Sequence, residues 1–577
     1  MSQSFQRTTS QRTISFVLGL LASVALFCCA SATDAKAQES SEKPVAVVAF
    51  SGYDALMTDI DFIGNLGNVP NLSAQIDGML GMFTQGKGLA GLDKGKPIGV
   101  VVRMDENGAP AGAICLPVTD LQALVGIGQG FGVTAEDKGN GLWEISSPGQ
   151  PEPMFAQEGN GWAFLAPSEQ MLEGAPADPD GVLGALTKEY DLAVKINVQE
   201  VPEAFKQQYV EFIAQMSEQG LRQNPGAEDA DIEELLAEQR KAMQEGMKDM
   251  DTLTVGLSLD SGQQRTFLDF VSTAIPGSDA AKQVAGMQDV TTDYAGFIQP
   301  DAAMMMTMAL KMDEKAQKQF IQSLSLNKQQ ALASIENEDD LDDEAKKVVK
   351  SAIDDLWAAL EATVAKGKFD IGAVMNLGAD DFSFVAGGFN GDPSKIESGI
   401  KKLMEVAKEN EEFPEVNWNA SSHNGVQFHT ASKEIPADEE EARQIFGDTL
   451  TMALGLGEES AYFAVGRNAV NAIKEVMDAS ASAGSKTVPP MEISFAATQI
   501  TEFASVIAGV EGGAEAQAMI EGVSNMLAND ASGRDHIRML LTIIPNGSKF
   551  RIEAEEGVLR AIGMLVMQAQ MQQAGAF

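Results

Sequence analysis

A two-residue turn followed by an alternating strand makes up the stretch Asn140-Gly141-Leu142-Trp143-Glu144-Ile145-Ser146. The same pattern returns in Asn424-Gly425-Val426-Gln427-Phe428-His429-Thr430. Tight hairpins prefer Asn-Gly because both residues tolerate a positive φ. A second pair of blocks follows in the same order, Gly161-Trp162-Ala163-Phe164-Leu165 and Ala461-Tyr462-Phe463-Ala464-Val465. Blocks that recur in a fixed order indicate two copies of one folding unit.

The repeated blocks predict an α+β protein made of two duplicated halves, residues 44–290 and 291–577. The apolar strand Val45–Phe50 opens the first half, and Ala302–Leu310 opens the second. Short hairpins join most of the strands, so we expect antiparallel sheets. Helical segments lie between the hairpins, and we expect them to pack on one face of each sheet.

The N-terminus has the pattern of a secretory signal peptide over residues 1–37. Arg7 and Arg12 precede an apolar run from Ile14 to Ala30, and Ala35-Lys36-Ala37 offers small residues for cleavage after Ala37. The apolar run is long enough that an uncleaved membrane anchor is the alternative. Either way the chain is expected to be exported, to the periplasm or beyond.

The composition excludes several classes of partner. The formal net charge is −42, which repels nucleic acid and anionic membrane surfaces. Weak divalent-cation binding by the acidic surface is an alternative use of this charge, although no calcium-loop spacing is present. Outside the signal sequence the only cysteine is Cys115. It lies in an apolar run and is predicted to be a small buried hydrophobe.

Residue patterns that carry catalysis are not evident in the sequence. Only three histidines occur, His423, His429 and His536, and a zinc site needs three or four converging ligands. Nucleophile-elbow and zinc-protease signatures are missing. A pair of carboxylates for glycoside hydrolysis stays open, because its geometry depends on the fold. The sequence therefore predicts no catalytic, cofactor-binding or metal-binding residues.

Methionine is the one unusual side-chain signal. The run Met304-Met305-Met306-Thr307-Met308, with Met312, has thioethers that could bind Cu(I). The run also occupies the position of the opening strand in the second half. We therefore interpret it as a buried strand in which methionine fills irregular space.

Several blocks resemble a group of uncharacterised exported proteins of planctomycete bacteria. They are Lys96-Pro97-Ile98-Gly99, Leu116-Pro117-Val118-Thr119-Asp120-Leu121 and Gly161-Trp162-Ala163-Phe164, together with the signal sequence and the acidic chain. The resemblance covers most of the chain after the signal sequence. It implies a cell-envelope setting, and it implies no activity or functional residue.

Two functions of different classes follow. The first is a non-enzymatic secreted or cell-envelope protein with a structural or interaction role, whose partners are other envelope proteins. The alternative is a periplasmic protein that binds lipid or another hydrophobic ligand between curved sheets and amphipathic helices. An enzyme ranks third. The oligomeric state has no signature in the sequence.

Overall fold

The computed structural model describes residues 43–67, 69–104, 110–148, 152–222, 229–336, 338, 341–378, 382–407, 414–511, 513–530 and 533–574. The predicted signal sequence lies outside these residues. Within them, no helix combines the length and the apolar character that a membrane span requires.

The predicted class, α+β with antiparallel sheets and helices, is confirmed. The chain divides into two compact units, residues 1–205 with 252–261 (unit 1) and residues 206–251 with 262–577 (unit 2). These bounds differ from those of the predicted halves. The reason is that the strand Arg265–Ala274, which closes the first half in sequence, pairs over its length with Gly547–Glu555 of unit 2.

The sheet of unit 1 is antiparallel throughout and runs in the order β4-β5-β6-β7-β3-β2-β1-β8-β9. Its strands are β1 (Ala46–Phe50), β2 (Ile98–Met104), β3 (Pro110–Pro117), β4 (Thr134–Gly139), β5 (Leu142–Ser146), β6 (Met154–Gly159), β7 (Trp162–Ala166), β8 (Leu192–Asn197) and β9 (Met250–Asp260). The helices between them are α2 (Tyr53–Leu66), α3 (Leu72–Phe83), α4 (Leu121–Gly128) and α5 (Pro179–Thr187), with short turns η1 (Gln129–Phe131), η2 (Gln170–Gly174) and η3 (Val198–Glu200).

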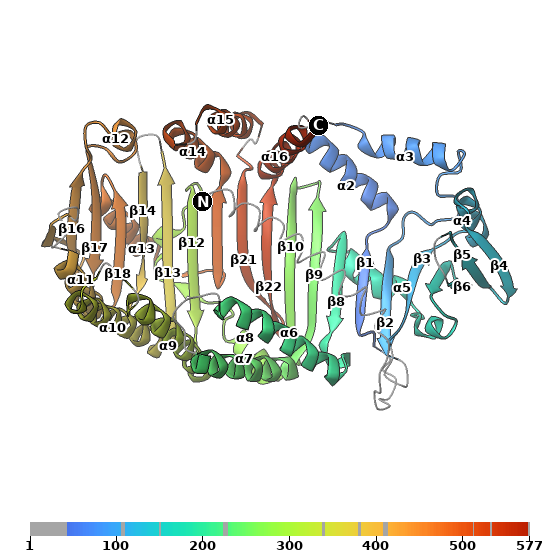
Figure 1. The fold of residues 1–577 in the computed structure, drawn as a ribbon, viewed down its shortest axis with the longest axis horizontal. Coiled ribbons are helices and arrows are strands. Elements are labelled where there is room, and N and C mark those ends of the chain that lie inside the picture. Colours follow the sequence, from blue (N-terminus) through green and yellow to red (C-terminus); the bar gives the residue numbers. More distant parts are fainter. Residues whose placement is uncertain are drawn as a thin grey trace. The chain divides into compact units, whose positions relative to one another are not determined.

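The sheet of unit 2 is also antiparallel, in the order β15-β16-β17-β18-β14-β13-β12-β20-β21-β22-β10 (Figure 1). Its strands are β10 (Arg265–Ala274), β12 (Met304–Lys311), β13 (Lys368–Leu377), β14 (Phe382–Phe389), β15 (Val416–His423), β16 (Val426–Glu434), β17 (Thr449–Leu456), β18 (Ser460–Gly466), β20 (Met491–Ala496), β21 (His536–Ile544) and β22 (Gly547–Glu555). A separate short pair joins β11 (Thr291–Thr292) to β19 (Lys486–Thr487).

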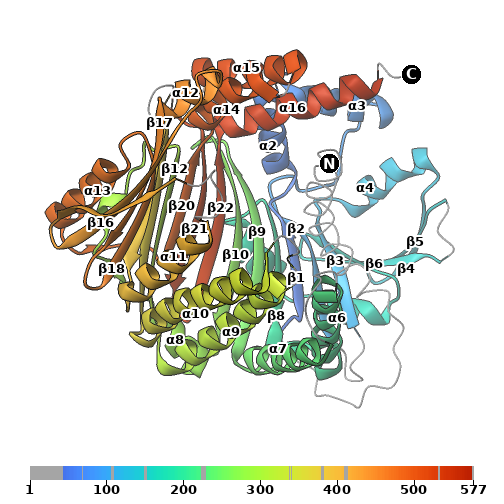
Figure 2. The same cartoon turned by 60° about the vertical axis from the view of Figure 1, so that its left-hand side comes forward.

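The helices of unit 2 lie between these strands in chain order. The last three pack on one another (Figure 2). They are preceded by eight others and one short turn. The full set is α6 (Glu203–Arg222, from residue 206 onward), α7 (Asp229–Asp249), α8 (Asp279–Ala285), η4 (Ala295–Phe297), α9 (Glu314–Glu336), α10 (Asp343–Ala365), α11 (Pro393–Ala407), α12 (Glu440–Phe446), α13 (Ala469–Ala483), α14 (Ala497–Glu511), α15 (Gly513–Asp530) and α16 (Glu556–Ala574).

The repeated hairpins take the predicted form. Asn140 and Gly141 have φ of 56° and 78°, and Asn424 and Gly425 have φ of 47° and 82°. Positive φ at both central residues is the geometry of a type I′ turn, whose twist matches that of the two strands it joins. The turns therefore connect β4 to β5 and β15 to β16, and each pairing contains one register shift, between Asp137 and Gly139 and between Asn417 and Ser421.

The two sheets share one strand order. Read from β4 to β9, the order in unit 1 matches that from β15 to β21 in unit 2 when β1 is matched with β12 and each following strand with its counterpart. The helices follow the same plan, since a helix pair separates β1 from β2 and another pair separates β12 from β13. This correspondence supports the proposal of a duplication, made above from the repeated sequence blocks.

One face of the unit 2 sheet is covered along its middle by α13 and η4. Phe297 and Phe428 are fully buried there, beside Ile473 of α13. Gly372 on β13 makes room for this contact, because a Cβ at that position would lie 2.4 Å from the Phe297 ring. Burial of each large side chain contributes about 1.5–3 kcal/mol, so this cluster anchors the sheet. We call this the closed face of unit 2.

Candidate apolar binding face

The other face of the unit 2 sheet carries an uninterrupted row of apolar side chains. Residues directly opposite each other in paired antiparallel strands point to the same side of a sheet, so the register defines the row. From β17 to β10 it runs through Leu454, Phe463, Ala386, Ala373, Met306, Ile493, Met539, Ile552 and Leu268.

Two neighbouring rows repeat this character, and Thr266 is the one polar residue in the three rows. We call these rows together the open face of unit 2. The two further rows are Met452, Val465, Phe384, Met375, Met304, Phe495, Ile537, Ala554 and Thr266, and Leu456, Ala461, Gly388, Ile371, Met308, Met491, Leu541, Phe550 and Phe270.

The open face is only partly covered. Phe463, in the middle row, is 41% exposed, and Phe270 at the β10 end is 37% exposed. Every residue of β21 is partly exposed. Apolar side chains that are buried from solvent stabilise a fold, whereas a contiguous exposed set marks a surface that binds something. The open face therefore has the properties of a binding surface.

At β20, β21, β22 and the neighbouring β10, the side of the sheet opposite the open face carries charged side chains. Asp269 of β10 is fully buried and accepts two hydrogen bonds from Arg551, of 2.7 Å to Nε and 2.8 Å to Nη2. Arg265 pairs with Glu553 at 2.7 Å. The two sides of this part of the sheet therefore differ in polarity, with charged side chains on one side and apolar rows on the other. The apolar side is the open face.

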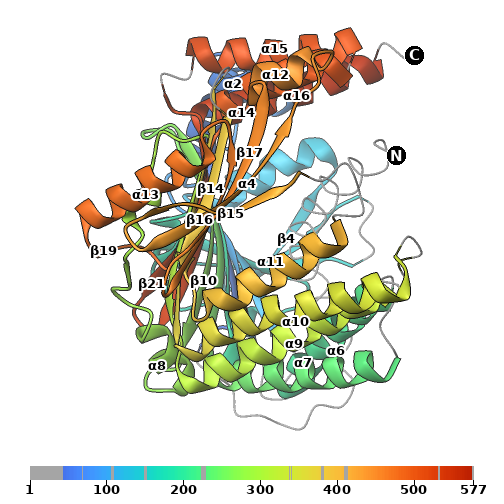
Figure 3. The same cartoon turned by 90° about the vertical axis from the view of Figure 1, so that its left-hand side faces the viewer.

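Helices border the open face at both ends of its strands (Figure 3). At one end Phe382 of β14 stacks on Phe503 of α14 at 5.9 Å and meets the edge of Phe446 of α12 at 5.0 Å. At the other end Phe369 of β13 contacts Phe320 of α9 at 6.3 Å. Figure 3 shows α13 on the opposite side of the sheet. The three apolar rows therefore lie between two sets of helices, one at each end of the strands.

A polar corner lies beside the open face on β15 and β16. His429 is paired with Leu454 and so continues the middle row. Its Nδ1 accepts a hydrogen bond from the Asn419 N–H at 3.1 Å, which leaves the proton on Nε2 in the neutral ring. Burial lowers the pKa of His429 and favours this neutral form. Trp418 contacts the His429 ring, and the Lys401 ammonium of α11 lies 5.1 Å from the Trp418 ring.

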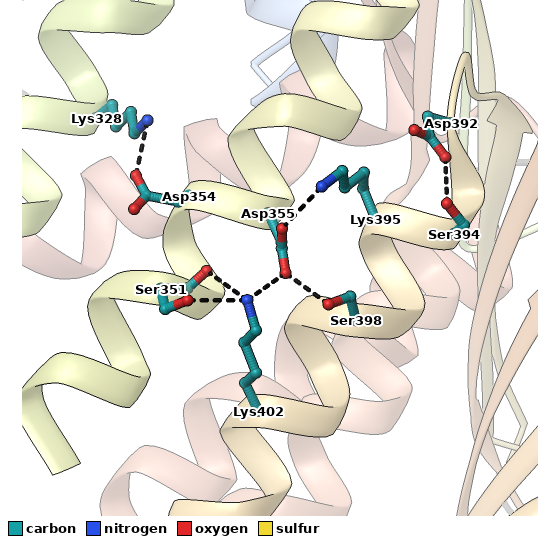
Figure 4. Close-up of polar contacts among 9 residues, drawn as sticks. All are labelled: Lys328, Ser351, Asp354, Asp355, Asp392, Ser394, Lys395, Ser398 and Lys402. Atoms are coloured by element: carbon teal, nitrogen blue, oxygen red, sulfur yellow. Dashed lines mark hydrogen bonds and ion pairs between the residues drawn. The ribbon is translucent and has the colours of Figure 1, made fainter. Parts of the chain in front are cut away.

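One carboxylate fixes α11 in place (Figure 4). Asp355 of α10 accepts hydrogen bonds from Lys402 Nζ at 2.5 Å, Ser398 Oγ at 2.6 Å and Lys395 Nζ at 3.2 Å. All three donors are on α11. These hydrogen bonds, led by the one from Lys402, hold the pKa of Asp355 well below its usual range. The carboxylate is therefore charged at neutral pH and joins the two helices.

We expect Asp355→Asn to lower the free energy of unfolding by about 2 kcal/mol, because charge-assisted hydrogen bonds contribute about 1.5–3 kcal/mol each and both lysines are partly exposed. Since the pKa of Asp355 is lowered by folding, its contribution is present above the usual carboxyl range and fades as pH falls below it. Urea unfolding at pH 7 measures the loss.

Asp354→Asn is the matched control. Asp354 is the adjacent residue, and its ion pair with Lys328 at 2.8 Å leaves the carboxyl 57% exposed. A surface pair contributes at most about 1 kcal/mol. Equal effects of the two substitutions would contradict a special role for Asp355.

The methionine run forms β12 in the centre of the sheet. Its residues alternate, so that Met305 and Thr307 are buried on the closed face while Met304, Met306 and Met308 belong to the open face. The interpretation of the methionine run as the opening strand of the second half is confirmed. The predicted burial applies only to the side of the strand that belongs to the closed face. Met375, Met452, Met491 and Met539, from four other strands, join the same face, and the sequence run alone does not reveal them.

The other residues singled out in the sequence lie apart from each other. His423 pairs with Asp478 of α13 at 2.8 Å, and His536 at the start of β21 lies beside Asp535 and Glu555. In the described part of the chain no three His, Cys, Asp or Glu side chains are grouped to hold a metal ion. Cys115 is fully buried, as predicted, and burial raises the pKa of its thiol to about 12.

Comparisons with protein-family models, with curated proteins and with solved structures find no match.

The open face has a local signal in the sequence. In Met491–Ala496 the residues alternate as Met491, Ile493 and Phe495 on one side and Glu492 and Ser494 between them. Such alternation predicts a strand with one apolar side. The alignment of nine such strands into continuous rows depends on register, which a single sequence does not show.

Proposed function

We propose that this protein is a non-enzymatic, exported binding protein that holds the hydrocarbon chains of a lipid on the open face of unit 2. The observation that carries the proposal is the set of three apolar rows, in which Phe463 of the middle row, near the β17 end, is 41% exposed. The predicted signal sequence supports an envelope or secreted setting.

The chemistry of the open face favours a hydrocarbon chain. Its rows contain no charged side chain and only one hydroxyl, so they offer a ligand dispersion contacts and loss of water, with almost no hydrogen bonds. The strands that form it are already paired, which leaves no backbone groups for an added peptide strand. Methionine side chains adapt to ligands of different shape because they are unbranched and polarisable.

The charge of the chain selects the lipid class. At −42 the protein repels anionic headgroups, and this repulsion adds up over the whole surface. A neutral or zwitterionic headgroup meets no such barrier. Next to the open face, Trp418 and the Lys401 ammonium offer an amphipathic corner where a zwitterionic headgroup can lie.

Titration with N-phenyl-1-naphthylamine, a neutral apolar fluorophore, tests the proposal. We expect Phe463→Ser to weaken binding about tenfold, because loss of one apolar contact of about 1.4 kcal/mol corresponds to a factor of ten. Dioleoylphosphatidylcholine should displace the fluorophore, and an anionic lipid of the same chain length should displace it less.

Phe83→Ser serves as the control for surface hydrophobicity. Phe83 ends α3, is 69% exposed and lies outside the three rows. Its substitution is expected to leave the titration unchanged. Absence of fluorophore binding to the wild-type chain, or equal binding by wild type and Phe463→Ser, would refute the proposal.

A further inference from the structure

We infer that unit 1 carries a second, smaller site for the same class of ligand, a neutral or zwitterionic lipid chain. This inference rests on the proposed function of unit 2. It arises from the shared strand order of the two sheets, which predicts that equivalent strands present equivalent faces.

The closed faces of the two units correspond. In unit 2 the helix α13, which follows β18, covers that face. In unit 1 the equivalent helix α5, which follows β7, packs against β1. Leu183 of α5 is fully buried, and a Cβ on Gly99 of β2 would lie 2.4 Å from it. Gly99 and Gly372 therefore serve the same purpose on equivalent strands, where each admits a large side chain from above the sheet.

The opposite side of unit 1 carries apolar rows, as in unit 2. Register again defines them, and they contain no charged or hydrogen-bonding side chain. We call them the open face of unit 1. The rows are Val255, Val194, Val48, Val100 and Ile114, and Leu257, Leu192, Phe50 and Ile98.

Solvent reaches this second face at several points. Ile114 of β3 is 38% exposed, and Leu253 of β9, which lies on the same side as Val255, is 37% exposed. Val48, Val100 and all four residues of the Leu257 row are partly exposed. Valine and isoleucine at a solvent-accessible sheet centre cost free energy unless an apolar partner covers them.

Equivalent helices, α4 in unit 1 and α11 in unit 2, cover the same end of the two open faces. In unit 1, α4 follows β3 and packs with Leu124 and Val125 against Trp143 and Leu165. In unit 2, α11 follows β14 and packs near β17. The part of the unit 1 open face beyond α4 extends over β3, β2, β1, β8 and β9, and the residues of its two rows are exposed or partly exposed except Val194, which is 7% exposed. It is narrower than the open face of unit 2, which continues past the equivalents of β8 and β9 through β22 and β10.

Charge identifies a lipid chain as the occupant. The rows of unit 1 have no charge with which to complement a protein surface, and a second copy of a chain with net charge −42 would be repelled. An uncharged hydrocarbon chain needs no complementary charge on the face and is not repelled by the net charge of the protein. Because its side chains are mostly β-branched and stiff, this face should accept fewer ligand shapes than the methionine-rich face.

Native mass spectrometry of the full chain with dioleoylphosphatidylcholine tests the inference. At a lipid concentration between the dissociation constant of a wild-type site and that of an about tenfold weaker variant site, we expect mainly two bound lipids on the wild-type chain and mainly one on either Phe463→Ser or Ile114→Ser. The double variant should bind none. Ile114→Val, which keeps the apolar surface, should still bind two, and unchanged circular dichroism of Ile114→Ser excludes unfolding as the cause.

The outcomes separate the two proposals. One bound lipid on the wild-type chain, lost with Phe463→Ser and kept with Ile114→Ser, would overturn the second site and leave the first intact. No bound lipid on any variant or on the wild type would overturn both.

Discussion

Arg551→Met is expected to lower the free energy of unfolding by about 3–5 kcal/mol, among the largest effects available from one substitution in unit 2. Its partner Asp269 is fully buried and accepts two hydrogen bonds from the Arg551 guanidinium. Removing the guanidinium takes these two hydrogen bonds away from a buried carboxylate, and the Lys549 ammonium lies 3.8 Å from it. Urea unfolding at pH 7 measures the loss.

Arg538→Met is the matched control, with the same substitution on the same side of the sheet. Arg538 lies on β21, is 42% exposed, and pairs with Glu555 at 3.3 Å and Glu553 at 3.8 Å. Both carboxylates keep another partner without it, the His536 N–H for Glu555 and Arg265 for Glu553, so the substitution should change stability by less than about 1 kcal/mol. If both variants lost the same free energy, burial of Asp269 could not be the reason.

A double variant isolates the buried charge from the packing. Arg551 also lies 3.7 Å from the Phe267 ring, so some of the loss comes from that contact. Replacing both partners, as Asp269→Leu with Arg551→Met, removes the unpaired charge and should recover most of the stability. Failure to recover would assign the effect to packing against Phe267.

Local patterns predicted much of the fold. Asn-Gly turns and alternating strands are short-range features. They sufficed for the α+β class and for antiparallel hairpins. They also supported the matching of Val45–Phe50 with Ala302–Leu310, the regions that form β1 and β12.

Pairing between distant segments was not predictable in the same way. β12 lies between β13, the next strand along the chain, and β20, which comes late in the second half and is followed only by β21 and β22. The open face exists only because such distant strands align in register. Phe463 illustrates the limit, since its block was recognised as a strand but its exposure depends on what covers the finished sheet.

Asp59→Asn is expected to stabilise unit 1 at pH 8. Asp59 lies on α2 and is 7% exposed. Burial, and secondarily the nearby charge of Asp191, raises the pKa of its carboxyl from the usual 3.8 to about 7. The asparagine side chain is of similar size and carries no charge. The substitution therefore removes the cost of an ionised carboxylate in this site, up to about 4 kcal/mol for a shift of this size.

The sign of the effect depends on pH. Because the folded-state pKa of Asp59 lies above its unfolded value, the folded state binds the proton more tightly. Stability is therefore lost as pH rises from about 4 to about 7, and the full penalty is present above pH 7. Urea unfolding of wild type and Asp59→Asn at pH 4.5 and pH 8 should give similar stabilities at the lower pH and a clear advantage for the variant at the higher.

Asp61→Asn provides a control on the same helix with the opposite sign. Hydrogen bonds from the Ser73 side chain and backbone lower the pKa of Asp61, so its ionised form favours the folded state. Its removal should weaken the chain slightly at pH 8 and have less effect at low pH. If Asp59→Asn gave the same difference from wild type at both pH values, the carboxyl of Asp59 would have to be ionised throughout, and α2 would have to open enough to let water reach it.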